Sequence, residues 1–166
     1  KINDFILVDA RSGYAYGMYG TPSSRNVDAH TYGAEITSSY ALTNVVKFNS
    51  SIAYVKGKNE TDGLPLAQLA PLEGRLALAY DDKKHSYGAL LRLVAPKDEV
   101  AVGQGNISGQ DVGKSGGFGI FSLNAGYKPN KKTLIAAGVD NVFDKAYAEF
   151  ISRAGASVAG YTQTTR

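Results

Sequence analysis

The pattern that most clearly predicts the fold lies in residues 31–54, which read TYGAEITSSYALTNVVKFNSSIAY. Apolar and polar side chains alternate from Thr31 to Thr43, and after Asn44 the alternation resumes toward Tyr54. A period of two is typical of a β-strand whose two faces have different surroundings. The stretch therefore predicts a hairpin with a tight turn at Asn44 and with one apolar face.

Other parts of the chain have the same pattern. Five further segments alternate or are short and apolar, and we expect them to be strands: residues 2–9, 72–81, 87–93, 118–128 and 132–143. Glycine and tyrosine are abundant, with 19 and 11 residues, as is usual for strands and turns. The sequence thus predicts an all-β protein with antiparallel strands, about seven in number.

The composition excludes several classes of protein. The 166 residues contain no cysteine, which rules out disulfide frameworks, zinc ribbons and thiol nucleophiles. No stretch approaches the ~20 apolar residues of a membrane-spanning helix. The net charge is only +3, and the lysines gather at residues 83–84 and 128–132, where solvated turns explain them. Binding to nucleic acid is therefore not expected.

The connections between the expected strands alternate in length. The short ones lie at Asn44 and at residues 82–85 and 129–131, and the long ones are residues 10–30, 57–71 and 95–117. Antiparallel barrels that cross a membrane have short turns on the inner side and long loops on the outer side. The alternation therefore predicts an antiparallel transmembrane β-barrel.

Tyrosines support this interpretation. Four of them stand within a few residues of a short turn and share the parity of the apolar residues, and two stand near the opposite strand ends: Tyr40, Tyr80, Tyr87 and Tyr127, then Tyr32 and Tyr54. Tyrosine suits the membrane boundary because its ring can lie among acyl chains while its hydroxyl stays hydrated. We expect two membrane girdles. The alternative is a set of ordinary cross-strand tyrosines on a half-buried sheet.

The opposite face of the expected strands is polar. It contains Glu35, Lys47, Asn49, Arg92, Asn124 and Asp140. Such residues are costly in a sandwich core but not in a wide, hydrated barrel interior. We therefore expect them to face a lumen. Seven strands do not close an ordinary bacterial barrel, which has an even number, so we expect a fragment with missing neighbours on both sides.

Several motifs resemble the TonB-dependent outer-membrane receptors. Residues 137–147, AGVDNVFDKAY, are similar to the penultimate-strand signature NxFDKxY of that family, and Gly33-Ala34-Glu35 is similar to its GxE strand. Residues 122–127 resemble the strand that precedes the signature. The copper-receptor branch is the most similar in three segments: PLAQLAPLE at 65–73, VGQGNISGQD at 102–111 and ISRAGA at 151–156.

The resemblance implies a barrel of about 22 strands, plugged by an N-terminal domain, in the bacterial outer membrane. Such receptors bind a scarce nutrient and import it with energy from the inner-membrane TonB complex. Residues 1–166 would be a C-terminal portion of this barrel, without the plug, the TonB box and the final strand. The implied partners are outer-membrane lipid, the TonB complex and a small ligand, for which copper is the expected identity.

Copper as cargo calls for soft or imidazole ligands. Met18 lies in the first long connection and His30 lies where the next strand is expected to begin, so both would be on the outer side. They are weak candidates, because a packing methionine and a surface histidine explain them better, and two isolated side chains do not make a site. We expect the metal site mainly in the plug and in earlier strands, and we expect no other cofactor.

An enzymatic function is not expected. Residues 113–117, GKSGG, match the G-x-S-x-G pattern, but Ser115 is followed by an alternating strand instead of a helix, and no suitably placed histidine follows. Two other functions stay open beside nutrient uptake. One is a passive porin-like channel, which would conduct without TonB. The other is a soluble β-sandwich that binds a ligand with its long loops.

Overall fold

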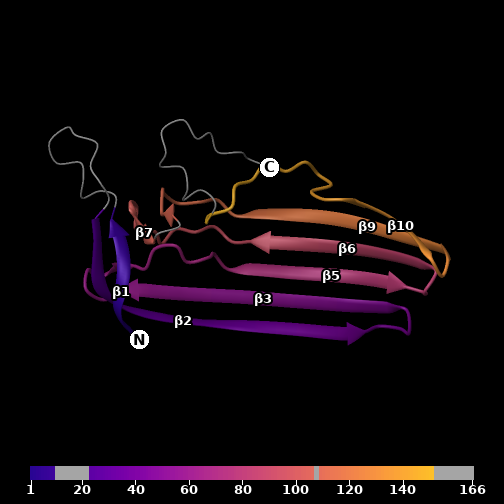
Figure 1. The fold of residues 1–166 in the computed structure, drawn as a ribbon, viewed down its shortest axis with the longest axis horizontal. Helices are drawn as coiled ribbons and strands as arrows, with labels where there is room; N and C mark the ends of the chain where they lie inside the picture. Colours follow the sequence, from indigo (N-terminus) through magenta and orange to yellow (C-terminus); the bar gives the residue numbers. More distant parts are fainter. Residues whose placement is uncertain (10–22, 107–108, 152–166) are drawn as a thin grey trace.

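The computed structural model describes residues 1–9, 23–106 and 109–151, and these form one antiparallel sheet (Figure 1). Its strands are β1 (Ile2–Asp9), β2 (Ser23–Ala41), β3 (Val46–Asn59), β4 (Leu64–Pro65), β5 (Glu73–Asp81), β6 (His85–Val94), β7 (Gln104–Asn106), β8 (Gly109–Gln110), β9 (Phe118–Asn130) and β10 (Thr133–Val139). Their order across the sheet is β10-β9-β6-β5-β3-β2-β1-β7-β8, with β4 beside β3. The all-β antiparallel fold is confirmed, and the sheet does not close on itself within the described residues.

The three expected hairpins are present. β2 pairs with β3, β5 with β6 and β9 with β10. In Figure 1 the tight turns of all three hairpins lie at the same end of the sheet, and the connections that follow β3 and β6 lie at the other. We call these the short-turn end and the long-connection end. Every described strand of the sequence prediction is therefore found, including the short apolar strand β1.

The register gathers the apolar side chains on one face of the sheet. One row of directly opposed residues crosses six strands: Tyr40, Phe48, Leu78, Ala89, Leu123 and Val139. Most of these side chains are exposed, and no second layer covers them in the part of the chain that the structure describes. This single sheet is not the β-sandwich of the soluble alternative, because a sandwich buries such a face against another sheet.

Gly33 shows why close strand pairing limits the side chain at one position of the GxE motif. A Cβ atom at Gly33 would lie 2.5 Å from the carbonyl oxygen of Tyr54 on the neighbouring strand. That separation is shorter than any ordinary contact, so the backbones of β2 and β3 would have to move apart. Glycine is therefore required here for the close approach of two backbones.

The long connections contain more structure than their sequences suggest. β2 begins at Ser23 and not near Thr31, because residues 23–29 pair with β1. Val27 and Ala29 from this extension are buried together with Leu7 of β1. The other connections contain β4, β7 and β8, and β3 continues to Asn59. These pairings depend on contacts between distant segments, so alternation along the chain does not reveal them.

Two expected boundaries on β9 and β10 were wrong. β10 ends at Val139 and not at Phe143, because Asn141 takes a left-handed conformation with φ 52° that ends the strand. The Asn141 side chain then bonds both backbone groups of Lys145, at 2.9 and 3.1 Å. Pro129 and Asn130 belong to β9, and the turn follows them at Lys131–Lys132, where Asn130 accepts a hydrogen bond from the Lys132 amide.

Buried apolar side chains gather at the long-connection end. Leu66, Ala67 and Ala101 are buried there, and Val94, Phe118 and Ile120 form a second cluster against Tyr147. Across residues 1–9, 23–106 and 109–151 there is no helix with the length and hydropathy to cross a bilayer.

Candidate functional site

Charged residues form a cluster on the polar face of the sheet, near the long-connection end. We call this cluster the polar wall, and it consists of Glu73, Arg75, Arg92 and Glu149. Arg75 of β5 stands directly opposite Arg92 of β6. Two like charges in this position repel each other. Glu73 offsets that repulsion, because its Oε1 accepts hydrogen bonds from Nε of Arg75 at 2.6 Å and from Nε of Arg92 at 2.9 Å.

Arg92 is the central residue of the polar wall. Its Nη2 donates to Glu73 at 2.7 Å, which completes a bidentate pair, and its Nη1 and Nη2 donate to the carboxylate of Glu149. The guanidinium also lies 5.4 Å from the ring centroid of Phe118. Arginine suits this role because its planar fork reaches two carboxylates and an aromatic face at once.

The segment after β10 packs against this part of the polar face. The Tyr147 ring lies 4.5 Å from that of Phe118, centroid to centroid, and Glu149 bonds Arg92. Phe150 is also buried. Residues 147–150 therefore cover one end of the face that the sequence predicts to be hydrated. The NxFDKxY motif contributes to this arrangement, since the Asn141 turn directs the segment away from the line of β10.

A hollow of about 640 Å³ lies beside the polar wall. Glu35, Ser51, Glu73, Arg75 and Tyr54 are among the residues that line it. Its charged and hydroxyl groups suit a hydrated ion or a polar solute. No group of three or more histidine, aspartate or glutamate side chains in the described ranges is arranged to hold a metal ion.

A second polar network connects the long connections to each other. Asp111 is buried and accepts hydrogen bonds at 3.0 Å from the backbone amide and the side-chain amide of Gln68, and from the Ala101 amide. Gln68 belongs to the PLAQLAPLE segment and Asp111 to the VGQGNISGQD segment. Two of the three motifs that resemble the copper-receptor branch are therefore joined in space, which the sequence did not predict.

The same end contains a further group of polar residues, in which Asn59 is buried. The buried Asn59 donates to Asp62 at 2.7 Å, and Arg25 forms a salt bridge with the same carboxylate. The hydrogen bond from Arg25 is the main reason that the pKa of Asp62 lies below its ordinary value. These contacts hold the turn after β3 against the extended part of β2. The alternation of residues gave no signal for the Arg25–Asp62 contact, because the two residues lie 37 positions apart in sequence.

The structure describes one of the two metal candidates. Met18 lies outside the described residues. His30 is exposed on β2, and its ring lies 6.0 Å from that of Tyr32, centroid to centroid. No described residue therefore joins His30 in a metal site, and its role as a ligand stays a prediction.

The six girdle tyrosines lie on the apolar face. Tyr80 pairs directly with Tyr87, and their ring centroids are 5.7 Å apart. Tyr32 and Tyr54 are 6.4 Å apart at the other end of the sheet. Tyr40 pairs with Phe48 and Tyr127 with His85, so both stand near the short turns on the same face, in the rows on either side of the Tyr80–Tyr87 pair. The arrangement is the one that two girdles require, and the contact of these rings with lipid stays a prediction.

The polar candidates share the opposite face. Lys47 pairs with Ala41 and Ala79, Glu35 with Ala53, and Asn124 with Gly88 and Gly138. Arg92 belongs to the polar wall described above, and Asp140 directly follows β10. The small residues opposite Lys47, Glu35 and Asn124 leave these side chains unobstructed. That this face lines a lumen stays a prediction.

Asp82 organises the turn between β5 and β6. Its Oδ1 accepts hydrogen bonds from the backbone amides of His85 at 2.6 Å and Lys84 at 2.9 Å, and its Oδ2 accepts one from the Tyr80 hydroxyl at 3.1 Å. The two backbone bonds hold the pKa of Asp82 well below its ordinary value of 3.8. The carboxylate therefore stays charged over the whole neutral range.

The turn is expected to loosen in acid. Because the folded pKa of Asp82 is depressed, its charge stabilises the turn at neutral pH, and this contribution is lost as the pH falls below about 4. Asp82→Asn is expected to raise amide exchange of the turn at pH 7, and the difference from wild type should shrink below pH 4. Hydrogen–deuterium exchange of residues 81–88 measures this. The control is Asp81→Asn, whose carboxylate accepts one backbone bond, from Lys83; an equal effect of both variants contradicts the assignment.

Comparisons with known proteins agree with this architecture. A family profile described as TonB dependent receptor-like, beta-barrel matches residues 1–142. Among solved structures, the copper transporter OprC is 43% identical with a TM-score of 0.82, over 90% of this chain and 22% of that protein. The FrpB iron transporter from Neisseria meningitidis (F3-3 variant) has the same fold, at 21% identity and a TM-score of 0.60, over 89% of this chain and 24% of that protein. A search of the curated proteins finds no match.

The two structural matches cover similar shares of this chain, and both are with metal transporters. The chain spans less than a quarter of the length of either transporter, and it aligns with each over most of its own length. The family match covers both faces of the sheet and all the long strands from β1 to β10. The chain therefore belongs to the TonB-dependent receptor-like β-barrel family.

Proposed function

We propose that this chain forms part of the barrel wall of a TonB-dependent receptor that takes up copper across a bacterial outer membrane. The observation that carries the proposal is the similarity to a copper transporter at 43% identity over 90% of the chain. The iron transporter, in contrast, is similar at a level that supports the fold alone. The proposal follows the copper match because both connection motifs that resemble the copper branch belong to the ordered network of Gln68 and Asp111.

In this function the chain supplies a scaffold. The apolar face with its tyrosines would lie against lipid, and the polar wall would line the interior beside the hollow at Glu35 and Arg75. The described residues contain no set of soft donors, although Cu(I) prefers such ligands. The copper ligands are therefore expected mainly outside the described residues, and the TonB complex would act on a part of the receptor outside this chain.

The function is tested with the complete receptor that carries this chain, expressed in bacterial cells. Copper uptake is expected in cells with TonB and is expected to be lost when TonB is deleted. Uptake or ion conductance that persists without TonB supports the passive channel instead. TonB-dependent uptake of another metal, with no uptake of copper, contradicts the cargo but not the receptor class.

The weak metal candidates are tested by titration of the purified receptor with copper. A Met18→Ala, His30→Ala double variant is expected to keep the wild-type affinity, because the site lies mainly elsewhere. His85→Ala is the matched control, since His85 lies at the short-turn end and pairs with Asp82. A loss of affinity in the double variant but not in the control assigns Met18 or His30 to the site.

A further inference from the structure

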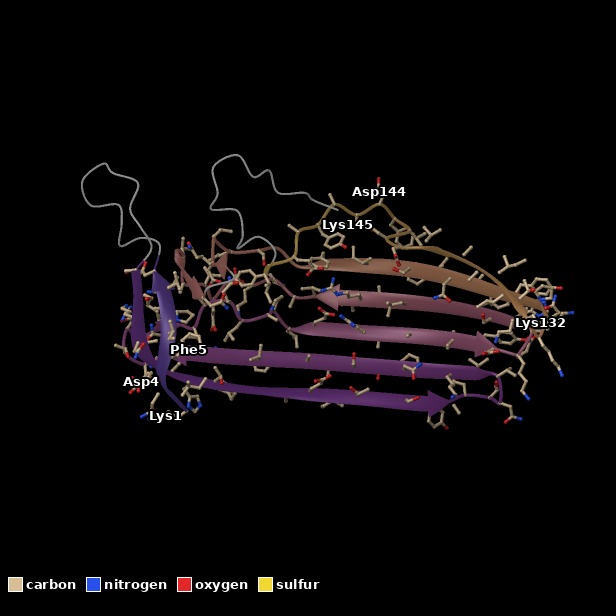
Figure 2. The ribbon with its side chains drawn as sticks, viewed as in Figure 1. Lys1, Asp4, Phe5, Lys132, Asp144 and Lys145 are labelled. Atoms are coloured by element: carbon tan, nitrogen blue, oxygen red, sulfur yellow. The ribbon has the colours of Figure 1, made fainter. Side chains whose placement is uncertain are left out.

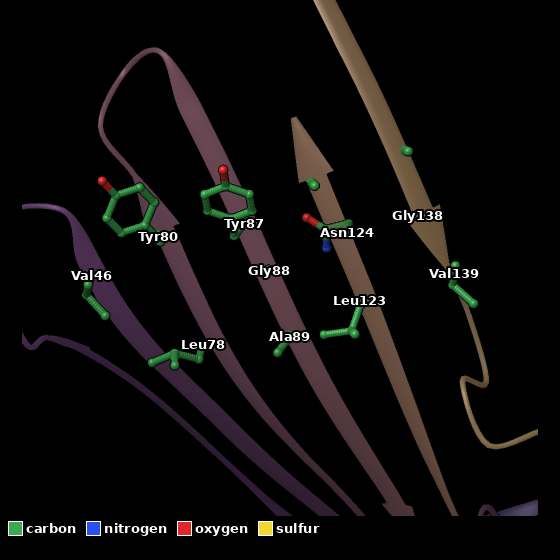
Figure 3. A pocket seen from close by; sticks show the side chains of 12 residues that line it. Val46, Leu78, Tyr80, Tyr87, Gly88, Ala89, Leu123, Asn124, Gly138 and Val139 are labelled. Atoms are coloured by element: carbon green, nitrogen blue, oxygen red, sulfur yellow. The ribbon is translucent and has the colours of Figure 1, made fainter. Parts of the chain in front are cut away.

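An apolar groove of about 530 Å³ lies on the apolar face near the short-turn end (Figure 3). Its lining includes Leu78, Tyr80, Tyr87, Ala89, Leu123 and Ala125. The volume falls in the range of about 300–1,000 Å³ that is usual for binding sites of small molecules. A groove with this position and lining would be open to acyl chains, not to water, in the membrane.

The groove exists because small residues meet larger ones across the strands. Ala125 stands between Tyr87 of β6 and Ala137 of β10, and Ala89 stands between Leu78 and Leu123. The alanines leave a depression between the larger side chains on either side. Figure 3 shows the rings of Tyr80 and Tyr87 next to each other, with their hydroxyl oxygens directed toward the β5–β6 turn.

Positive charge lies at the turn end of this groove. Five exposed lysines, which we call the turn lysines, lie in the β5–β6 and β9–β10 turns or, for Lys128, near the end of β9: Lys83, Lys84, Lys128, Lys131 and Lys132. The end of β9 contacts the β5–β6 turn, because the Lys128 amide donates to the Lys84 carbonyl at 2.8 Å. None of the five ammonium groups forms an ion pair with a carboxylate of the described residues. Figure 2 shows Lys132 at this end of the sheet, far from Lys1 and Asp4 at the other.

One of these cations is located on the apolar face itself. The Lys84 Nζ atom lies 5.8 Å from the centroid of the Tyr127 ring, and Tyr127 belongs to the same face as the groove. Tyr127 pairs with His85, two residues from the Tyr87 ring that lines the groove. Three features therefore follow one another along the apolar face toward the turns: the groove, the tyrosine rings and the Lys84 cation.

We infer that this surface binds an anionic phospholipid, with an acyl chain in the groove and the phosphate at the turn lysines. The inference rests on the proposed membrane location, which makes the short-turn end the periplasmic side, where phospholipids form the leaflet. Clustered lysines attract anionic headgroups, and each one near the membrane surface contributes about a fivefold gain in affinity. The phosphate would pair with lysine charges that have no carboxylate partner among the described residues.

The experiment uses the complete receptor in detergent and measures retained lipid by native mass spectrometry. Phosphatidylglycerol is titrated against phosphatidylcholine, which carries no net charge. Wild type is expected to retain phosphatidylglycerol preferentially. The triple variant Lys84→Gln, Lys128→Gln, Lys132→Gln is expected to weaken this binding at least tenfold, on the basis of about fivefold per lysine.

Two matched controls separate this site from general effects. The first control is a triple variant that removes three charges at the long-connection end: Lys58→Gln, Lys97→Gln, Lys114→Gln. It is expected to leave lipid retention unchanged. The second control concerns the groove. Ala125→Leu fills it without a change in charge and is expected to reduce lipid retention. Ser38→Leu places a leucine elsewhere on the apolar face, opposite Ser50, and is expected to have no effect. Ala125→Leu also keeps the test valid if the charge variant folds poorly.

Three results overturn the inference: equal retention of the two lipids, equal effects of both lysine triplets, or preferential retention of lipid A over phosphatidylglycerol. Each of them can occur in a receptor that still imports copper with TonB. If the wild-type receptor retains phosphatidylglycerol but does not import copper, the proposed function is contradicted and the lipid site is not. The two proposals therefore fail on different measurements.

Discussion

Ile36→Arg is expected to destabilise the folded receptor by about 2–4 kcal/mol in lipid vesicles, because the charge would lie on the lipid side of the sheet near the middle of a strand. Ile36 is 65% exposed and stands directly opposite Ile52 on β3. In water, such a substitution at an exposed position would cost little. In a bilayer, a cation at this depth has no partner and must displace lipid or draw in water.

The matched control for Ile36→Arg is the next residue in the chain. Thr37 points to the polar face, where it stands opposite Ser51. Thr37→Arg is expected to change stability by less than about 1 kcal/mol, because charge on a hydrated lumen face is tolerated. Unfolding of the vesicle-inserted receptor by guanidinium gives both values. An equal cost for the two variants, or a greater cost for Thr37→Arg, contradicts the assignment of the faces to lipid and lumen.

Arg92→Ala is expected to destabilise the receptor by about 1.5–3 kcal/mol, because it removes charge-assisted hydrogen bonds and leaves two carboxylates without their common partner. Glu73 and Glu149 would face each other across the polar wall. The segment that includes Tyr147 is expected to detach from Phe118, since the Arg92–Glu149 contact holds it there. Amide exchange and limited proteolysis of residues 144–150 report that detachment.

Arg75→Ala is the control for the polar wall. Arg75 bonds Glu73 but not Glu149, and its side chain is more exposed than that of Arg92. Its loss is expected to cost no more than about 1 kcal/mol and to leave the segment in place. Increased exchange of residues 144–150 in Arg75→Ala, or unchanged exchange in Arg92→Ala, contradicts the role assigned to Arg92.

Alternation along the chain was sufficient to predict the central strands. In β2, β3, β5, β6 and β9 the side chains alternate between two faces with different surroundings, so a pattern with period two is visible locally. The ends of the strands were predicted less accurately, because they depend on the backbone conformation of single residues and on pairing with distant strands. The left-handed Asn141 ends β10, and the pairing with β1 extends β2 back to Ser23.

The candidate site was predicted in part. The register unites the predicted tyrosines on one face and the predicted polar residues on the other, although their contacts with lipid and lumen stay predictions. Of the four residues of the polar wall, only Arg92 was among the residues that the sequence analysis expected to face a lumen. Its partner Glu149 is 57 positions away, and Asp111 is 43 positions from Gln68, so no periodicity of the chain connects them.

The amino-acid sequence by itself determined that the chain forms antiparallel ribbons with one apolar face, and its motifs indicated the receptor family. These properties are local, since each residue's face follows from the parity of its position along the strand. Only the tertiary structure decided how the outer connections are joined, where residues 147–150 cover the polar face, and where alanines on three strands create a groove beside the turn lysines. Those features arise from contacts between residues far apart in the chain, whose positions are set by the registers of several strands together.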